Sequence, residues 1–183
     1  FLAFDIVVSP LSFSIFSYGF RPFFLAAGAY AILPIIPWLL YLMNLIEPSI
    51  PLQAWHAHEM IFGFVTAGIA GFLLSAMPSW TNTAPMIGKN LKILFGLWVL
   101  GRIIFWLFLF FENPIFGYLL FVDLALPIAL LIHVSHVLIE AKNNRNYIFI
   151  GILLCLAIAN FLTILDLNGL GLSSFNLGFF LQS

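Results

Sequence analysis

Charged residues are scarce in this sequence. They make up 7% of its 183 positions, whereas 63% of the residues are hydrophobic. An ordinary soluble domain is about 25% charged. This composition excludes a soluble globular domain and indicates an integral membrane protein.

Basic residues and cysteine are also few. Six Lys and Arg residues are scattered along the chain and the formal net charge is -1, so no basic patch of the kind that binds nucleic acid is present. The single cysteine, Cys155, excludes an internal disulfide and a cysteine metal cluster. Because it stands in an apolar run, we expect Cys155 to be a small buried hydrophobe.

The ends of the chain indicate a piece of a longer protein. The sequence begins at Phe1 without an initiator Met, and its last apolar run is "LGLSSFNLGFFLQS". As a helix this run reaches about 21 Å, which is short of a hydrocarbon core about 30 Å thick. We therefore expect two partners, the lipid bilayer and a missing C-terminal half of the same protein.

Apolar runs of spanning length alternate with short connections rich in Pro, Asn and Ser. The predicted spans are residues 22–43, 56–77, 91–111, 115–139 and 147–165, with a partial sixth at 170–183. The expected fold class is all-α: a polytopic transmembrane helix bundle of about five to six spans, forming one domain over residues 1–183.

The cations predict the orientation. With a cytoplasmic N-terminus, five of them fall inside: Arg21, Lys89, Lys92, Lys142 and Arg145. The opposite connections carry no Lys or Arg, and their charged residues are the acids Glu47, Glu112 and Asp166. This asymmetry predicts a cytoplasmic N-terminus. Trp55 and Trp80 bracket the second span and are expected to lie in the aromatic belts at the two interfaces.

Two histidines and a carboxylate stand together in "WHAHEM", residues 55–60. With a span that begins at residue 56, His56, His58 and Glu59 lie in its first outward turn, within about 5 Å of the interface. His56 and His58 are about 200° apart on a helix, so they chelate one ion only if the helix begins after them. The small residues Gly63, Ala67 and Gly71, spaced four apart, form a stripe on the face of His56, which predicts helix packing there and an imidazole that points toward a neighbouring helix.

A second histidine pair, His133 and His136, is three residues apart and shares one helix face. It lies about 27 Å or more further from the outer end than the first pair, so the two pairs cannot share one metal. Arg102 and Asp123 are both expected at a depth of about 12 Å in adjacent antiparallel spans. An ion pair between them gives the lowest free-energy cost for placing either charge in a membrane.

Each of these features also has a purely structural interpretation. His56, His58 and Glu59 fit the polar start of a helix at the interface, where the helix dipole favours Glu59. His133 and His136 fit a polar cytoplasmic rim. Arg102 and Asp123 fit a clamp between helices. From the residues alone, these alternatives stay open beside the ligand roles.

Three blocks of the sequence together resemble the NnrS family of bacterial inner-membrane proteins. They are "YGFRPFFLAAGAYAILPIIPWLLYL" from Tyr18, "WHAHEMIFGFVTAGIAGFLLSAMPSWTNT" from Trp55 and "LWVLGRIIFW" from Leu97. The resemblance covers most of the chain and fades after about residue 140. Family members have roughly twice as many spans, so the chain resembles their N-terminal half.

The resemblance implies a protein that binds haem and copper and takes part in the response to nitric oxide, as in denitrification. It implies cofactor-binding roles for His56, His58, Glu59 and Arg102, with His56 and His58 as metal ligands and a weaker case for His133 and His136. Glu59 would orient an imidazole, and Arg102 would meet a haem propionate in place of Asp123.

A different class of function also fits the residues. In a proton- or solute-coupled transporter, Arg102, Asp123 and the inner histidines would form a relay across the membrane, and Pro34, Pro37 and Pro127 would break its helices. No hydrolytic or transferase motif is found, so an enzymatic role rests on redox chemistry with haem or copper.

Overall fold

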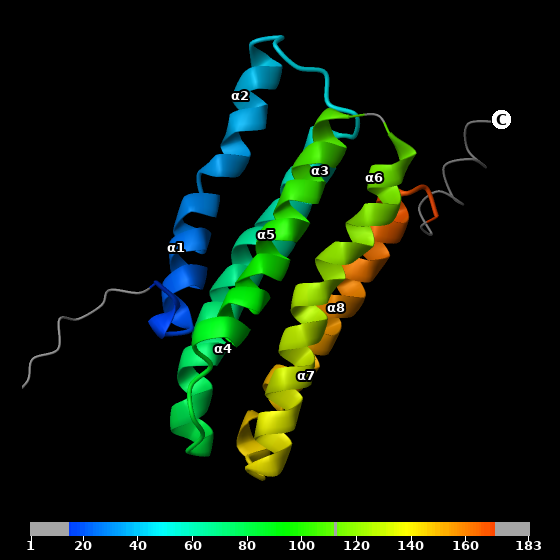
Figure 1. The fold of residues 1–183 in the computed structure, drawn as a ribbon. Coiled ribbons are helices and arrows are strands. Elements are labelled where there is room, and N and C mark those ends of the chain that lie inside the picture. Colours follow the sequence, from blue (N-terminus) through cyan, green and yellow to red (C-terminus); the bar gives the residue numbers. More distant parts are fainter. Residues whose placement is uncertain (1–14, 112, 171–183) are drawn as a thin grey trace, which may run out of the picture.

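The computed structural model describes residues 15–111 and 113–170 (Figure 1). Within these residues every regular element is a helix, which confirms the predicted all-α class. The partial sixth span lies outside the described residues except for Leu170, and so does Glu112.

Among the described residues, five helical segments are long and apolar enough to cross a membrane, in agreement with the five full-length spans predicted. They are Phe20–Leu42, Leu52–Thr81, Gly88–Phe110, Pro114–Glu140 and Asn144–Leu167. The second span begins at Leu52 rather than at residue 56, because Pro51 caps a helix that already contains "LQAWHAH".

Proline divides the first span into α1 (Phe20–Tyr30) and α2 (Ile36–Leu42), which follow a short 3-10 turn at Ile15–Ser17. The two helices are joined by a 3-10 segment at Leu33–Ile35. Because Pro34 and Pro37 lack a backbone N–H, the α-helical hydrogen-bond pattern cannot continue through this stretch. The break leaves backbone carbonyls, including that of Pro34, free to accept side-chain donors.

The second span is α3 (Leu52–His58), a π-helical segment at Glu59–Val65 and α4 (Thr66–Thr81), which ends at left-handed Asn82. A π-helix holds more residues in each turn than an α-helix, so it changes which side chains share a face. Single π turns in proteins often occur at functional sites. Here the segment begins at Glu59, inside the "WHAHEM" stretch.

The third span is one helix, α5 (Gly88–Phe110). The fourth is α6 (Pro114–Leu119), a 3-10 segment at Leu120–Leu124 and α7 (Ala125–Glu140), and the fifth is a 3-10 turn at Asn144–Asn146 followed by α8 (Ile148–Leu167). Pro127 cannot donate to the carbonyl of Asp123, in agreement with the 3-10 geometry there.

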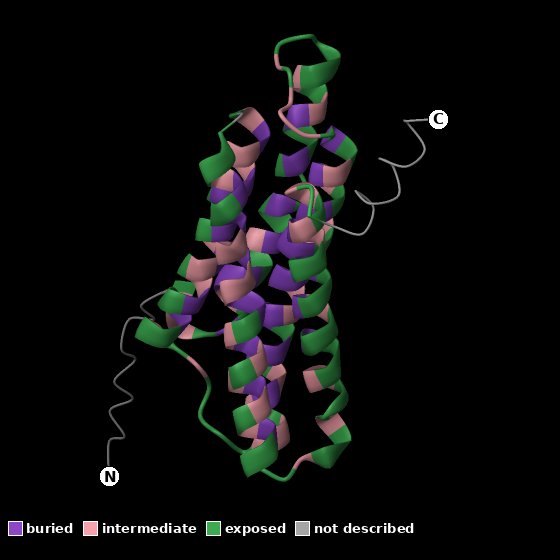
Figure 2. Cartoon of the chain, turned by 90° about the vertical axis from the view of Figure 1, so that its right-hand side faces the viewer, coloured by how far each residue is buried: buried purple, intermediate pink, exposed green. Residues whose placement is uncertain are grey.

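The spans run up and down as one bundle with short connections (Figure 1). Buried residues line the interior between helices, and exposed residues cover the outside (Figure 2). The second span is the most enclosed, with half of its apolar window buried, whereas only 17% of the fifth is buried. Cys155, on the outer face of α8, is exposed, so the expectation that it is buried was wrong. A span that packs on one face only leaves most of its side chains outside.

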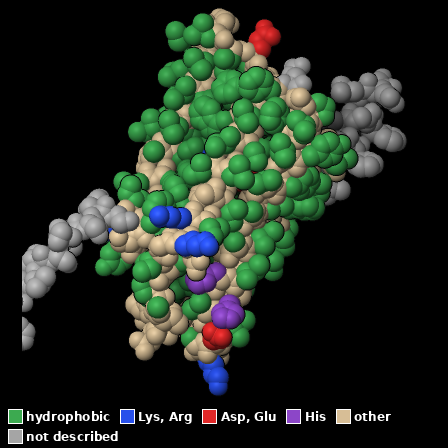
Figure 3. All heavy atoms as spheres, in the orientation of Figure 1, with side chains coloured by type: hydrophobic (Ala, Val, Ile, Leu, Met, Phe, Trp, Pro, Cys, Tyr) green, Lys and Arg blue, Asp and Glu red, His purple; other side chains and the backbone are tan. Residues whose placement is uncertain are grey.

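The surface is mainly hydrophobic, and the Lys and Arg side chains visible on one face lie in its lower half (Figure 3). The connections at that end join α4 to α5 and α7 to α8 (Figure 1). The distribution fits a membrane protein whose surface cations lie at one end of the bundle. The cytoplasmic position of that end stays a prediction.

Two apolar cores fill the bundle, one above the other. One contains Ala67, Trp98 and Leu130, and the other contains Trp55, Phe105 and Leu120. Between them, spans two to five each place one or two polar side chains at the same level: His58 and Glu59, Arg102, Asp123, and Asn160. The bundle thus encloses a polar layer in the middle of its apolar interior.

Candidate functional site

The enclosed polar layer receives side chains from all five spans. Its members are Tyr30, His58, Glu59, Arg102, Asp123 and Asn160, and each is 4% exposed or less. Buried polar groups without partners are costly in an apolar interior, so the contacts among these residues decide whether the layer stabilises the bundle.

Arg102 lies at the centre of the layer between two carboxylates. Its Nη1 donates to Glu59 Oε1 at 2.6 Å, and its Nη2 donates to Asp123 Oδ1. One guanidinium thus bridges the second, third and fourth spans, because its planar fork can serve two acceptors at once. Arg102 and Asp123, which were expected at equal depth in the membrane, are in contact in the structure. Glu59 is an additional partner of Arg102.

His58 uses both of its ring nitrogens inside the layer. Its Nδ1 lies 3.1 Å from Glu59 Oε1, and its Nε2 lies 3.0 Å from Asn160 Oδ1 and 3.4 Å from Asp123 Oδ2. Asn160 Nδ2 donates to Asp123 Oδ2 at 2.9 Å, so its Oδ1 faces His58 and Nε2–H is the donor to that oxygen. The ring stacks on Phe105 with centroids 3.6 Å apart. His58 is therefore held in place, with a polar atom of another residue against each of its ring nitrogens.

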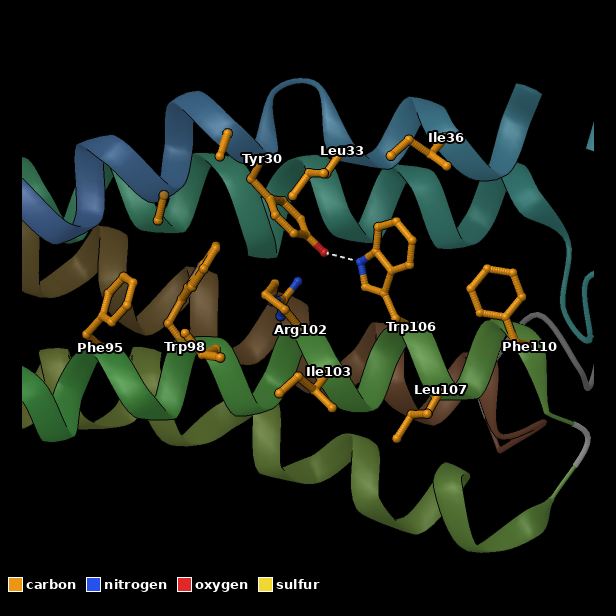
Figure 4. Close-up of a pocket in the computed structure, with 13 residues that line it drawn as sticks. Tyr30, Leu33, Ile36, Phe95, Trp98, Arg102, Ile103, Trp106, Leu107 and Phe110 are labelled. Carbon is orange, nitrogen blue, oxygen red and sulfur yellow. Dashed lines mark hydrogen bonds between the residues drawn. The ribbon is translucent and has the colours of Figure 1, made fainter. Parts of the chain in front are cut away.

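Tyr30 connects the first span to the layer. Its hydroxyl donates to Glu59 Oε2 and accepts a hydrogen bond from Trp106 Nε1 at 2.6 Å (Figure 4). Glu59 thereby accepts from Tyr30 and Arg102 and contacts His58. All of its oxygen atoms have partners from other residues.

Two glycines allow the helices to approach closely enough for these contacts. A Cβ at Gly63 would lie 2.8 Å from Tyr30 Cε1 and 2.9 Å from Arg102 Nη1. A Cβ at Gly101 would collide with the carboxylate of Asp123. The stripe that includes Gly63 and buried Ala67 therefore packs against neighbouring helices, and at Gly63 it also makes room for the polar layer.

His56 lies apart from the layer and is only partly buried. Its Nδ1 is 3.3 Å from the carbonyl oxygen of Pro34, in the break of the first span, and its ring meets Trp38 edge to face at 6.1 Å. It therefore points toward a neighbouring helix, as its position on the face of the small residues Gly63 and Ala67 predicted. Because a carbonyl only accepts, Nδ1 carries a hydrogen, and in the neutral form of the ring Nε2 then has the lone pair. Nε2 makes no hydrogen bond to the described residues.

The two histidines of "WHAHEM" do not form a chelating pair. Both belong to α3, which begins at Leu52, so they diverge around the helix. The early start also corrects the expected depth: His58 lies six residues into the helix, about 9 Å along it, rather than within about 5 Å of its outer end. Trp55 is fully buried and donates to the carbonyl of Phe105 at 3.1 Å, so its expected place in an interfacial belt was wrong.

His133 and His136 lie on α7, apart from the polar layer. His136 is 68% exposed, and its Nε2 is 3.4 Å from Glu140 Oε1 on the same helix. His133 is half-buried and makes no hydrogen bond or ion pair to the described residues. Of the two interpretations of His133 and His136, a ligand pair and a polar rim, their arrangement resembles the polar rim.

Two members of the polar layer, Tyr30 and Asn160, were missed by sequence reasoning, and so was Trp106, which donates to the Tyr30 hydroxyl. Asn160 carried a usable signal, since it is the one amide within the apolar run "ILLCLAIANFLTIL" of the fifth span. Tyr30 and Trp106 stand among many aromatic residues, and nothing in their spacing marks Tyr30 as a partner of Glu59 or Trp106 as a donor to Tyr30.

No group of three or more His, Cys, Asp or Glu side chains is arranged to hold a metal ion within residues 15–111 and 113–170. A metal held by this part of the chain would therefore take few ligands from it. Haem iron needs only one or two axial ligands, whereas a closed tetrahedral site needs four.

Five spanning helices around a buried polar layer define a polytopic helical membrane protein. The family model described as "NnrS protein" matches residues 14–181, and the chain belongs to the NnrS family. No curated protein and no solved structure matches this chain.

Proposed function

We propose that this chain belongs to a haem- and copper-binding membrane protein of the bacterial inner membrane that takes part in the response to nitric oxide and nitrosative stress. The family assignment and one feature of the structure support this proposal. The feature is His56, which has one ring nitrogen bonded to a backbone carbonyl and the other available.

This arrangement of His56 is typical of histidines that bind metals. Metal-binding imidazoles donate their second ring N–H to a carboxylate or a backbone carbonyl, which fixes the tautomer and the ring orientation. The Pro34 carbonyl takes that role, and it is available because the proline-broken helix does not use it. Edge-to-face contact with Trp38 holds the ring from another side.

The other predicted site residues fit a supporting role better than direct ligation. Both nitrogens of His58 are engaged, and Arg102 is bonded to two carboxylates. Glu59 contacts His58 and thereby orients an imidazole, although not the one that is free. We therefore propose His56 as the ligand from this chain and the polar layer as the frame that holds the second span in place.

A haem iron or copper ion held by His56 would supply a redox-active centre that can bind a small diatomic molecule. The chain itself contributes the imidazole, its tautomer and the apolar surroundings. The direct test is purification: we expect visible haem absorption and bound copper in the wild-type protein. A colourless, copper-free protein after growth with both cofactors supplied would contradict the proposal.

One observation favours the transporter alternative. Three spans are interrupted near the polar layer, by 3-10 segments at Leu33–Ile35 and Leu120–Leu124 and by the π segment at Glu59–Val65. Discontinuous helices near buried charges are typical of secondary transporters. Reconstituted vesicles that take up solute or protons without any bound haem would favour that function.

A further inference from the structure

A polar pocket of about 410 Å³ lies at the end of the bundle where the surface cations gather. Its lining residues come from the last turn of α4, from the turn between α7 and α8, and from the start of α8 (Figure 1). They are Trp80, Asn143, Arg145, Asn146 and Phe149. The volume falls within the range of small-molecule sites in proteins, about 300–1,000 Å³.

Hydrogen bonds and ring contacts hold the walls of this pocket together. Asn143 Nδ2 donates to the Trp80 carbonyl at 2.8 Å, which ties the end of α4 to the turn after α7. Asn146 Nδ2 donates to Asn143 Oδ1 at 3.1 Å. The ring of Trp80 stacks on Phe149 with centroids 5.2 Å apart. The pocket is therefore built before a ligand arrives, so that binding needs little ordering of its side chains.

Arg145 brings a positive charge to the pocket that the described residues do not neutralise. Its side chain is exposed and makes no hydrogen bond or ion pair within the described part of the chain. Lys142, in the same turn, is also exposed and makes no ion pair with those residues. The acid closest in sequence, Glu140, lies 3.4 Å from His136 Nε2. The charge of the turn therefore favours an anion as the ligand.

The donors around the pocket favour phosphate among the anions. A guanidinium can donate two parallel hydrogen bonds to phosphate oxygens. Asn146 Nδ2 has a second hydrogen beyond the one given to Asn143, and Trp80 Nε1 makes no hydrogen bond to the described residues. A phosphate group carries four oxygens around one centre, so it can accept from donors on several sides.

The surface beside the pocket favours a lipid over a free phosphate. Phe72 meets Trp80 edge to face at 5.8 Å, lies 6.0 Å from the ring of Phe149 and is 46% exposed. It stands eight residues before Trp80, about 12 Å further along the second span. An apolar strip thus leads from the pocket toward the middle of the membrane. Basic pockets between transmembrane helices bind anionic lipid headgroups in other proteins.

We propose that this pocket binds the headgroup phosphate of an anionic phospholipid. Arg145 donates to the phosphate, Trp80 and Phe149 flank it, and an acyl chain lies along the strip that contains Phe72. A lipid bound there contacts α4 and α8 together. The inference does not depend on the haem and copper proposal, because no pocket residue is a proposed metal ligand.

The test is native mass spectrometry of the purified protein, titrated in detergent with dioleoylphosphatidylglycerol or dioleoylphosphatidylcholine. The two lipids share their acyl chains, but only the first has a net negative charge. We expect phosphatidylglycerol to bind more tightly and to raise the thermal unfolding midpoint, because a ligand of the folded state stabilises it. Equal affinity for the two lipids would overturn the proposal. Displacement of phosphatidylglycerol by an equal concentration of inorganic phosphate would also overturn it.

Variants locate the site. Arg145→Gln should weaken phosphatidylglycerol binding by about tenfold or more, because hydrogen bonds to a charged group are lost. Arg145→Lys should keep part of the affinity, since it retains the charge without the planar fork. The side chain of Arg145 is exposed and has no described partner, so both variants should unfold as the wild type does in detergent without added lipid.

Lys89→Gln is the matched control, because Lys89 is exposed at the start of α5, at the same end of the bundle, and does not line the pocket. It should bind phosphatidylglycerol as the wild type does. Wild-type affinity in Arg145→Gln would show that the lipid binds elsewhere. An equal loss in Lys89→Gln would show that only the overall charge of this end matters, and either result would make the inference wrong.

Discussion

Arg102 Nη1 donates to Glu59 Oε1 at 2.6 Å, and both side chains are almost completely excluded from the surface. Through this bond the second and third spans share a charge pair in the middle of the bundle. Asp123 shares the same guanidinium, so the position of Glu59 depends on three spans at once.

The first prediction concerns the strength of this pair. In a double-mutant cycle with Glu59→Gln and Arg102→Gln, the two single changes should together cost more stability than the double change. Removing one partner of a buried pair leaves an uncompensated charge, at a cost of about 3–5 kcal/mol. We therefore expect a coupling energy of at least about 1 kcal/mol, measured by reversible unfolding in detergent.

Lys89→Gln is the matched control for that cycle, because Lys89 is exposed at the start of α5. It should change stability by no more than about 0.5 kcal/mol. Strict additivity of the Glu59 and Arg102 changes would show that the two groups do not interact as the structure has them.

The second prediction concerns the close approach at Gly63. Gly63→Ala should destabilise the protein by about 1–3 kcal/mol, because its methyl group would overlap Tyr30 and Arg102. Gly68→Ala, in the same span, has no atom within 4 Å of the new Cβ and should be neutral or slightly stabilising. The measurement is the thermal unfolding midpoint of each variant. Equal midpoints for the two would be inconsistent with tight packing at Gly63.

The fold and part of the polar layer could be predicted from the sequence. Apolar run length predicts the five spans, because the bilayer sets the length of each helix. Arg102 and Asp123 could be paired because depth can be counted from the helix ends. Tyr30 could not be found in this way, since its role depends on the hydroxyl of one ring among many reaching Glu59.

The roles of His56 and His58 could not be separated by counting alone. The helix starts four residues earlier than hydropathy indicates, and the π segment alters the faces that follow. Both effects depend on how the second span packs against the others. Spacing therefore predicts that the two rings diverge, whereas only the structure shows which ring is buried.

The third prediction tests the link through Tyr30. Tyr30→Phe removes one hydroxyl but leaves both Glu59 Oε2 and Trp106 Nε1 without that partner. We expect a loss of about 1–3 kcal/mol in the free energy of unfolding. Tyr118→Phe, at a site that is 74% exposed, is the control and should be neutral. A neutral Tyr30→Phe would mean that the hydroxyl contributes nothing to the layer.

The fourth prediction concerns the anchor of the fifth span. Asn160→Leu removes the contacts with His58 and Asp123, and we expect it to cost about 0.6–1.7 kcal/mol, the range of polar contacts between membrane helices. Thr163→Val on the same helix removes a hydroxyl that bonds only to the Ala159 carbonyl of its own helix. It should have little effect on unfolding. If the two variants unfolded alike, Asn160 would not anchor the span.

The most direct test of the account is the metal and haem content of His56→Ala beside that of His58→Gln. We predict that His56→Ala loses haem absorption or copper while its unfolding midpoint stays near that of the cofactor-free wild-type protein, because the ring lies outside the polar layer. His58→Gln should keep the cofactors and unfold at a lower temperature, because it disturbs the bonds to Glu59 and Asn160. Unchanged cofactor content in His56→Ala, or cofactor loss in His58→Gln alone, would contradict the assignment of His56 as the ligand.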